Sequence, residues 1–270
     1  MAPAFPARRE ATFRATFRAP APTRWALAVA AAPGLPVVDE RVEVRLDGRP
    51  VPAGWLADAH GTRLLALETG AGELVAEYRA VVAGLADPAP VDPLDALVYV
   101  RPSRYVPSDA LAPLARSTFP GLAGVDLLRA VGDWVFERLV YDPAATEATG
   151  GAAETLERGA GVCRDYAHLV AALLRGLDVP ARVVSVYAPQ LDPPDFHAVV
   201  EALVDGRWLA VDATRLAPRR GMLRIATGRD AADTAWASNA HAEVELVSLE
   251  VAASADVLLT EDPAEPVELC

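Results

Sequence analysis

The chain has 270 residues, and because single domains usually run to about 100–200, this length fits one large domain or two smaller ones. Hydrophobic residues make up 52% of the chain and charged residues 23%, which excludes a disordered or fibrous protein. A formal charge of -12 predicts a surface that repels nucleic acid and anionic membranes. No apolar run approaches the roughly 20 residues of a membrane span, so we expect neither nucleic acid nor a membrane as a partner.

The first third of the chain predicts β structure. Short alternating runs from Ala11 to about Gly84 are separated by turns such as Asp47-Gly48, which indicates an all-β N-terminal domain. Residues 86–120 are rich in proline and predict a long connector with at most a short helix. We therefore place a β-rich domain at residues 1–95 and a second domain at residues 96–270.

The second domain begins with helical patterns and continues with strands. Residues 126–140 have the apolar spacing of an amphipathic helix with Asp126 as its cap, and a second helix begins near Cys163 with one apolar face and ends at Gly176. Strands are predicted at residues 182–187, 197–204 and 207–212. Asp205-Gly206 separates the last two, and an Asp-Gly pair between strands is a strong hairpin signal.

The two cysteines, Cys163 and Cys270, are too few for a disulfide framework, and no Cys/His cluster has zinc-ligand spacing. We therefore expect a reducing compartment, the cytoplasm. The competing interpretation is a signal peptide, because arginines precede the apolar run at residues 25–32. Glu10 and the alternating residues 12–17 before that run are more typical of a strand.

Cys163 follows the glycine-rich segment 159–162, where a loop leads into a helix. The positive end of the helix dipole favours a thiolate at such a position. A lone cysteine is more often a small buried hydrophobic residue, so an assignment as nucleophile needs a base and an acid nearby.

The predicted hairpin supplies both groups. If Asp205-Gly206 is a two-residue turn, Val199 lies opposite Asp212, and His197 is the diagonal neighbour of Asp212 on the same face. Diagonal neighbours are about 7–8 Å apart, within reach of a hydrogen bond between an imidazole and a carboxylate. Cys163, His197 and Asp212 are therefore candidates for nucleophile, base and orienting acid. The alternative is a solvated strand with an unrelated histidine and acid.

These residues resemble motifs of the bacterial transglutaminase-like superfamily. The motifs occur in family order at Gly161–His168, Val179–Arg182, His197–Glu201, Trp208–Thr214 and Gly228–Asp230, and Pro102–Tyr105 and the β-rich first third are similar to the N-terminal region of such proteins. The resemblance implies an α+β fold, in which a papain-like core, with the cysteine-bearing helix packed on an antiparallel sheet, follows an all-β N-terminal domain. It implies a Cys163, His197 and Asp212 triad, so that residues 96–270 form a transglutaminase-like catalytic domain.

The resemblance also implies a reaction, in which a thioester forms on Cys163 from an amide and is resolved by an amine or by water. We expect a peptide or amide substrate and no cofactor, and no acidic cluster of the calcium-binding kind is present. Many members of the family have tryptophan two residues after the catalytic histidine, where this chain has Val199. A hydrophobic wall that excludes water is therefore not predicted, and we favour a cysteine protease or amidase over a cross-linking acyltransferase.

Other residues offer weaker candidates. His241 and Asp256 share the spacing of His197 and Asp212, but no Asp-Gly turn lies between them, so residues 241–260 are predicted to be ordinary strand. His168 lies about 140° around the helix from Cys163 and is predicted to be a packing residue. His60 lies in a turn without any further signal, and Cys270 is predicted to be a mobile, incidental thiol.

Two other functions remain open. A catalytically silent scaffold of the same fold would need none of the three triad residues, so their presence together favours an enzyme. An arylamine-type acetyltransferase would use a similar triad, but no phosphate-binding signal for coenzyme A is present and the chain is acidic.

Overall fold

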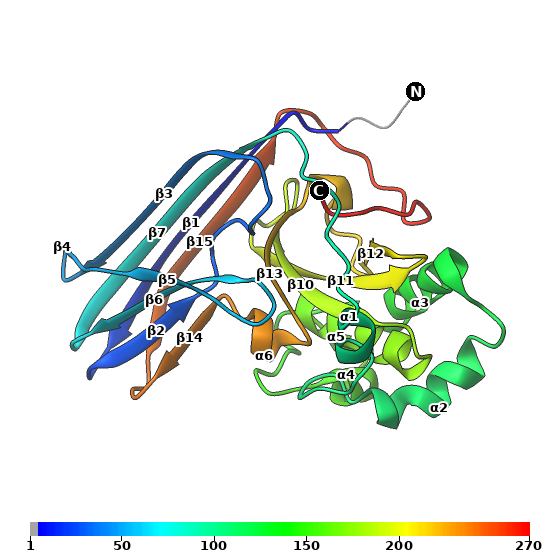
Figure 1. Cartoon of the computed structure of the whole chain (residues 1–270). Helices are drawn as coiled ribbons and strands as arrows, with labels where there is room; N and C mark the ends of the chain where they lie inside the picture. Colours follow the sequence, from blue (N-terminus) through cyan, green and yellow to red (C-terminus); the bar gives the residue numbers. More distant parts are fainter. Residues whose placement is uncertain (1–4) are drawn as a thin grey trace.

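A computed structural model describes residues 5–270 and contains two antiparallel sheets that we call the β unit, seen on the left of Figure 1. Their strand orders are β15-β1-β7-β3-β4 and β14-β2-β6-β5. The strands are β1 (Arg8–Ala19), β2 (Thr23–Leu27), β3 (Val37–Leu46), β4 (Arg49–Pro50), β5 (Gly54–Ala57), β6 (Arg63–Thr69), β7 (Gly72–Ala83), β14 (Ala237–Ala240) and β15 (Glu245–Ala255). In β1, Ala11, Phe13 and Ala15 are buried and alternate with more exposed residues, as the period of a strand requires.

The rest of the chain forms what we call the α+β unit, on the right of Figure 1. Its sheet has the antiparallel order β12-β11-β10-β13. The strands are β10 (Ala181–Tyr187), β11 (Phe196–Val204), β12 (Arg207–Val211) and β13 (Leu223–Gly228). The helices are α1 (Asp95–Val98), α2 (Ser108–Thr118), α3 (Gly124–Arg138), α4 (Ala152–Arg158), α5 (Cys163–Gly176), α6 (Ala231–Thr234) and a 3-10 turn at Arg219–Gly221, and two short strands, β8 (Val140–Tyr141) and β9 (Ala160–Gly161), form a parallel pair.

Both predicted Asp-Gly turns are present. Asp47 (φ 48°) and Gly48 (φ 75°) join β3 to β4, and Asp205 (φ 51°) and Gly206 (φ 73°) join β11 to β12. Left-handed backbone at both positions is the geometry of a hairpin turn that matches the strand twist. Val204 pairs with Arg207, so the predicted register of the second hairpin is confirmed.

Helix α5 has the predicted bounds, but its environment differs from the prediction of one apolar face. Every residue from Asp165 to Gly176 is buried, because helices α2, α3 and α4 and strand β11 all pack against α5. Its polar residues are therefore held inside the protein rather than facing solvent.

Two local predictions are wrong. The expected connector contains the three-turn helix α2, which forms despite Pro113 because Leu111 and Ala115 are buried and α2 packs closely on α5. Helix α3 begins at Gly124, so Asp126 lies inside the first turn, where it interacts with the helix dipole, and Ala123 occupies the cap position without a side-chain hydrogen bond.

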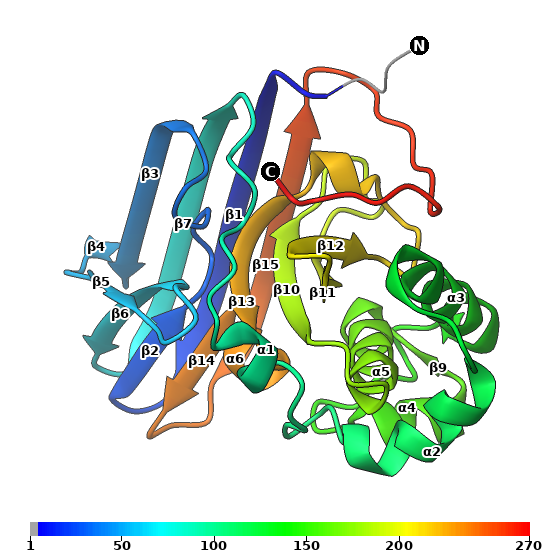
Figure 2. The same cartoon turned by 45° about the vertical axis from the view of Figure 1, so that its right-hand side comes forward.

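The predicted division at residue 95 coincides with the start of α1, but residues 96–270 are not one unit. Strand β15 pairs with β1 and β14 pairs with β2, so the chain returns to the β unit for these two strands (Figure 2). The segment after β15 then packs back on the α+β unit, where the N–H of Ala210 donates a 2.7 Å hydrogen bond to the carbonyl oxygen of Val267. These pairings join residues more than 200 positions apart, which no local pattern of the sequence encodes.

The two units share a hydrophobic core. The rings of Phe13 and Phe196 lie 5.7 Å apart, and Tyr78 stacks on Tyr187 with their centroids 6.4 Å apart. The Tyr187 hydroxyl also donates a 2.6 Å hydrogen bond to the carbonyl oxygen of Val29. The β unit therefore supports the back of the sheet whose β11 strand carries His197. Within residues 5–270, no helix combines the length and the apolar character needed to cross a membrane.

Candidate active site

Cys163 is the first residue of α5, and the turn before it is fixed by backbone contacts. Gly159 ends α4 in a left-handed conformation (φ 71°), and the main-chain N–H of Val162 donates a 2.9 Å hydrogen bond to the Asp165 carboxylate, which caps α5. A Cβ atom on Gly161 would lie 2.6 Å from Oδ2 of Asp165, so this close approach requires glycine. Cys163 is partly exposed rather than buried in the core.

Arg164 holds the loop next to Cys163. Its guanidinium donates hydrogen bonds to the Thr146 hydroxyl at 2.8 Å and to the Glu147 carbonyl oxygen at 2.5 Å. It also lies 3.1 Å from the Asp165 carboxylate that caps α5. The segment between β8 and α4 is thereby tied to the first turn of the helix.

His197 and Asp212 meet as the hairpin register predicted. Nε2 of His197 lies 2.8 Å from Oδ2 of Asp212, and both side chains are almost completely buried. The other carboxylate oxygen accepts hydrogen bonds from the main-chain N–H of Thr214 at 2.9 Å and from its hydroxyl at 2.7 Å. Thr214 therefore holds the Asp212 carboxylate in place, and the carboxylate in turn orients the imidazole of His197.

The surroundings of His197 favour its charged form. Burial alone lowers the pKa of His197, but the charge and hydrogen bond of Asp212, together with the nearby Cys163 sulfur, outweigh burial and raise this pKa to about 10. Burial raises the pKa of Asp212, and His197 and Thr214 more than reverse that effect, so the net shift is downward. The site thus stabilises an imidazolium beside the Asp212 carboxylate.

The hydrogen bond to Asp212 also determines which ring nitrogen of His197 faces the thiol. Because the carboxylate accepts, Nε2 carries the proton, and Nδ1 is left to exchange a proton with the thiol. Nδ1 is buried and has no conventional hydrogen-bond partner within residues 5–270, while the Cys163 sulfur is close enough to raise the pKa of the ring.

The rival pair does not reach Cys163. His241 is exposed in the turn after β14, and Asp256 follows the far end of β15, where its carboxylate accepts a hydrogen bond from the N–H of Ala7. Strand β15 alone separates the two residues by roughly 35 Å. Both residues therefore belong to the β unit, as strand and turn positions.

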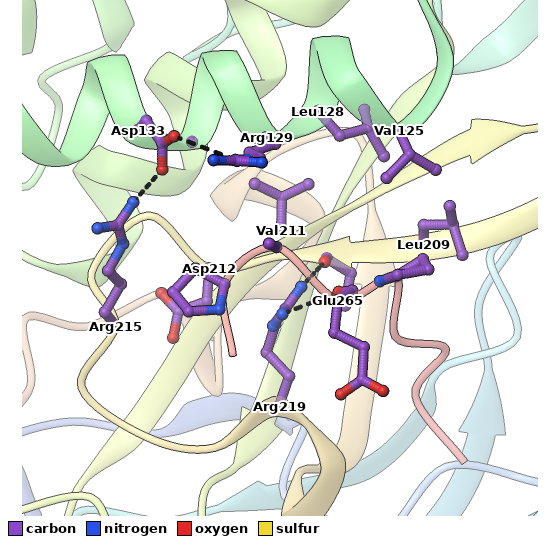
Figure 3. Close-up of a pocket in the computed structure, with 15 residues that line it drawn as sticks. Val125, Leu128, Arg129, Asp133, Leu209, Val211, Asp212, Arg215, Arg219 and Glu265 are labelled. Carbon is purple, nitrogen blue, oxygen red and sulfur yellow. Dashed lines mark hydrogen bonds and ion pairs between the residues drawn. The ribbon is translucent and has the colours of Figure 1, made fainter. Parts of the chain in front are cut away.

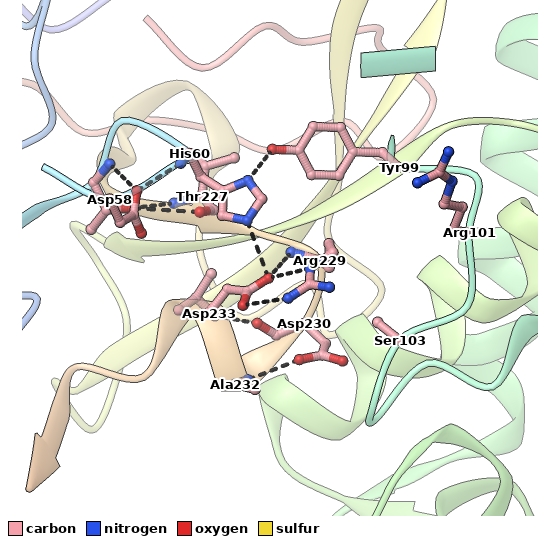
Figure 4. A network of polar contacts seen from close by, with 12 residues as sticks. Asp58, His60, Tyr99, Arg101, Ser103, Thr227, Arg229, Asp230, Ala232 and Asp233 are labelled. Atoms are coloured by element: carbon pink, nitrogen blue, oxygen red, sulfur yellow. Dashed lines mark hydrogen bonds and ion pairs between the residues drawn. The ribbon is translucent and has the colours of Figure 1, made fainter. Parts of the chain in front are cut away.

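The other histidines have structural partners. His168 is fully buried, stacks on Tyr105 and accepts a hydrogen bond from the N–H of Ala231, and burial lowers its pKa to about 4, as expected of a packing residue. His60, which has no signal in the sequence, lies between the Tyr99 hydroxyl at 2.8 Å and the Asp233 carboxylate at 3.3 Å (Figure 4). This network joins the β unit to α1 and α6.

Cys270 is not loose at the end of the described chain. Its main-chain oxygen accepts a 2.6 Å hydrogen bond from Arg9, which is itself fully buried. Burial raises the pKa of the Cys270 thiol, with a further contribution from Glu268, so its environment disfavours a thiolate. The expectation of a mobile residue is wrong because Arg9 holds the backbone.

Two cavities lie near these residues, but neither includes the thiol. The one beside Asp212, between α3 and β12, has a volume of about 30 Å³ and is bordered by Asp133, Arg215 and Arg219 (Figure 3). It is large enough only for a water molecule or two. A cavity of about 620 Å³ lies between the connector, the β unit and the back of the sheet, and none of Cys163, His197 and Asp212 lines it.

Two further residues, Val199 and Tyr141, concern the surroundings of the site. Val199, two positions after His197, is only 1% exposed and packs in an interior cluster with Val184 and Met222. Tyr141 was missed by the sequence reasoning, although its hydroxyl lies near the main-chain N–H and the sulfur of Cys163. The sequence signal that it has is weak: an aromatic residue between a predicted helix and the glycine-rich turn before Cys163.

Comparisons with known proteins agree with this fold. Residues 115–213 match the sequence profile of the Transglutaminase-like superfamily. The chain is similar to the crystal structure of a proposed cysteine protease from Cytophaga hutchinsonii, with 31% identity, a TM-score of 0.86 and coverage of 97% of this chain and 95% of that one. It is 29% identical over 114 residues to an uncharacterized protein of Mycobacterium leprae, and this match spans 41% of that protein. The periplasmic domain of TgpA from Pseudomonas aeruginosa is more distant, with 23% identity, coverage of 73% of this chain and 88% of that one, and a TM-score of 0.40.

Proposed function

Because the chain belongs to the transglutaminase-like superfamily, we propose that it is a thiol-dependent enzyme that opens an amide bond through a thioester on Cys163. The observation that carries the proposal is the convergence of three side chains from α5, β11 and the end of β12. Asp212 holds Nε2 of His197 at 2.8 Å, and Nδ1 remains available to the free thiol of Cys163. This is the arrangement of a nucleophile, a base and an orienting acid.

In the proposed reaction, Cys163 attacks as a thiolate while His197 is an imidazolium, because Asp212 raises the pKa of His197 above neutrality. The sulfur forms a bond to the amide carbon, and the imidazolium gives its proton to the departing amine as the C–N bond breaks. His197 is then neutral and takes a proton from water as the water oxygen bonds to the acyl carbon. The C–S bond breaks, the acid leaves, and the thiolate of Cys163 and the imidazolium of His197 are restored.

We propose hydrolysis rather than transfer to an amine, with a peptide as the substrate. One support is Val199, a small aliphatic residue where many members of the family have tryptophan, so no aromatic ring at this position excludes water. The other is the similarity to the Cytophaga hutchinsonii protein. We also propose a reducing compartment, the cytoplasm, in which both cysteines remain free thiols.

The thioester can be tested without knowledge of the natural substrate. p-Nitrophenyl acetate reports acylation as released nitrophenolate, and peptide mapping then locates the acetyl group. We expect acetylation at Cys163 in the wild type and in Cys270→Ala, and none in Cys163→Ala, which should still fold because the side chain is small and half-buried. Acylation of Cys163→Ala at the wild-type rate would contradict the proposal. No acylation of the wild type would also contradict it and would favour a silent scaffold.

Hydrolysis and amine transfer are separated by a second measurement. A glutamine-bearing peptide is offered with and without millimolar primary amine, and the products are identified by mass. We expect the free acid in both cases. If amine adducts are the main product, the proposal of hydrolysis is wrong and the enzyme is a cross-linking acyltransferase.

A further inference from the structure

Tyr141 lies beside the thiol and has no role in the proposed reaction so far. It is the second residue of β8, and its Cα pairs with that of Gly161 on β9, two positions before Cys163. The N–H groups of Val140 and Asp142 donate hydrogen bonds to the carbonyl oxygens of Gly159 and Gly161, at 2.9 and 3.0 Å. The backbone of Tyr141 is thus fixed relative to the start of α5.

The ring of Tyr141 is also supported. It packs against Tyr166 with the ring centroids 6.1 Å apart and the planes tilted by 42°. Tyr166 is buried and donates a 2.8 Å hydrogen bond to the carbonyl oxygen of Leu139, so the supporting ring cannot turn away. Tyr141 itself is 41% exposed, so its side chain is not enclosed by the rest of the protein.

The hydroxyl of Tyr141 is a hydrogen-bond donor at the pH where the enzyme would work. Burial, followed by the effect of the Cys163 sulfur, raises the pKa of Tyr141 to about 12, so the phenol keeps its proton. The main-chain N–H of Cys163, in the first turn of α5, lies next to the phenol oxygen. Asp195 and Asp212 also act on Tyr141, and because both are carboxylates they raise its pKa further and can only accept a hydrogen bond.

We propose that Tyr141 is a catalytic residue, whose O–H and the main-chain N–H of Cys163 together donate hydrogen bonds to the oxygen of the tetrahedral intermediate. The proposal rests on the proposed function. When the Cys163 sulfur bonds to the carbonyl carbon, the π electrons of the C=O bond move to oxygen, which becomes negative. They return when the C–N bond breaks and the amine leaves with the proton of His197. Fixed donors at that oxygen stabilise the charge only while it exists, which accelerates the reaction.

The test compares two reagents on Tyr141→Phe, which keeps the ring and its packing. Acylation by p-nitrophenyl acetate passes through an oxyanion, whereas alkylation by iodoacetamide displaces iodide at a saturated carbon and does not. We expect acylation of Cys163 to be slower by about 10²-fold and alkylation to change by less than about twofold. Tyr105→Phe, which also loses a phenol but packs on His168, should match the wild type with both reagents.

The outcomes separate this inference from the proposed function. Wild-type acylation in Tyr141→Phe would overturn the role of Tyr141, and so would an equal slowing with both reagents, because Tyr141 would then act on the thiol itself. After either result, the proposal of a thioester on Cys163 still stands if Cys163→Ala is inactive. If Cys163→Ala is acylated as fast as the wild type, the proposed function fails instead. Thermal unfolding of Tyr141→Phe near the wild-type temperature shows that the fold is retained.

Discussion

Nε2 of His197 lies 2.8 Å from Oδ2 of Asp212, while both hydrogen bonds from Thr214 reach the opposite carboxylate oxygen. One carboxylate oxygen of Asp212 is therefore bound by Thr214, and the other orients the imidazole of His197. This division of contacts leaves Nδ1 as the only ring nitrogen that can serve the thiol.

Asp212→Asn tests this orientation. If the amide oxygen keeps the contacts with Thr214, its NH₂ group faces Nε2, which must then accept, so a neutral His197 carries its proton on Nδ1 and cannot take one from the thiol. We expect acylation by p-nitrophenyl acetate to fall by about 10²- to 10⁴-fold, with little change in thermal unfolding. Asp133→Asn, a half-exposed carboxylate bordering the small cavity, serves as the control. A rate within threefold of the wild type would show that Asp212 does not set the tautomer.

The pKa of His197 predicts a loss of stability in alkali. The folded protein raises this pKa from 6.5 to about 10, so it binds the proton more tightly than the unfolded chain does. The resulting stabilisation is fully present below pH 6.5 and is lost as the pH rises through about 10. Urea unfolding should show a wild-type free energy of unfolding that falls between these limits by at least about 1.4 kcal/mol more than that of His197→Gln. Parallel pH profiles of the two proteins would refute the prediction.

Removal of the buried charge of Glu201 on β11 should strongly lower the free energy of unfolding. Its carboxylate is fully buried and bonds to both Arg182 and Arg224, and Arg182 also lies 3.8 Å above the ring of Trp208. Glu201→Gln leaves two guanidinium groups without a counter-charge, so we expect a loss of about 3–5 kcal/mol in the free energy of unfolding. Glu68→Gln, which breaks the exposed pair with Arg24, should cost less than about 1 kcal/mol. Equal costs for the two variants would contradict this view of the buried cluster.

Gly161→Ala tests the turn that presents Cys163. The new Cβ would lie 2.6 Å from Oδ2 of Asp165 and 2.7 Å from its Cβ, so the cap on Val162 must shift. We expect a loss of about 1–3 kcal/mol in stability and at least a tenfold slower acylation of Cys163. Gly150→Ala, whose Cβ would meet its nearest atoms at 3.5 Å, should behave like the wild type. If Gly161→Ala is as active as Gly150→Ala, the close approach is not needed.

The part of the site that the sequence predicted depends on short-range chemistry. Asp205-Gly206 determines a two-residue turn, and the turn determines the register that brings His197 to Asp212. The start of α5 at Cys163 follows from the glycine-rich turn before it in the same way. Both features need only residues close in the chain, and both are confirmed.

The features that were missed depend on distant residues. Tyr141 reaches Cys163 through the pairing of β8 with β9, two strands of two residues each, whose hydrophobic pattern is too short to read. His60 acquires its partners only when α1 and α6 pack against the β unit. Helix α2 contains a proline that disfavours it locally, and packing on α5 outweighs that preference.

The return of β15 to β1 makes the completion of the first sheet a late event in synthesis. Arg9 pairs with Ala255, so β1 leaves the ribosome well over 200 residues before its outer partner exists, a delay on the order of ten seconds or more. During that time one edge of β1 has unpaired N–H and C=O groups that could capture another chain. The helices and the four-stranded sheet of the α+β unit are synthesised in the interval, between two strands that have not yet met. Arrival of β15 then closes the exposed edge, so a nascent chain that stalls after residue 236 would carry Cys163, His197 and Asp212 on a scaffold still prone to aggregate.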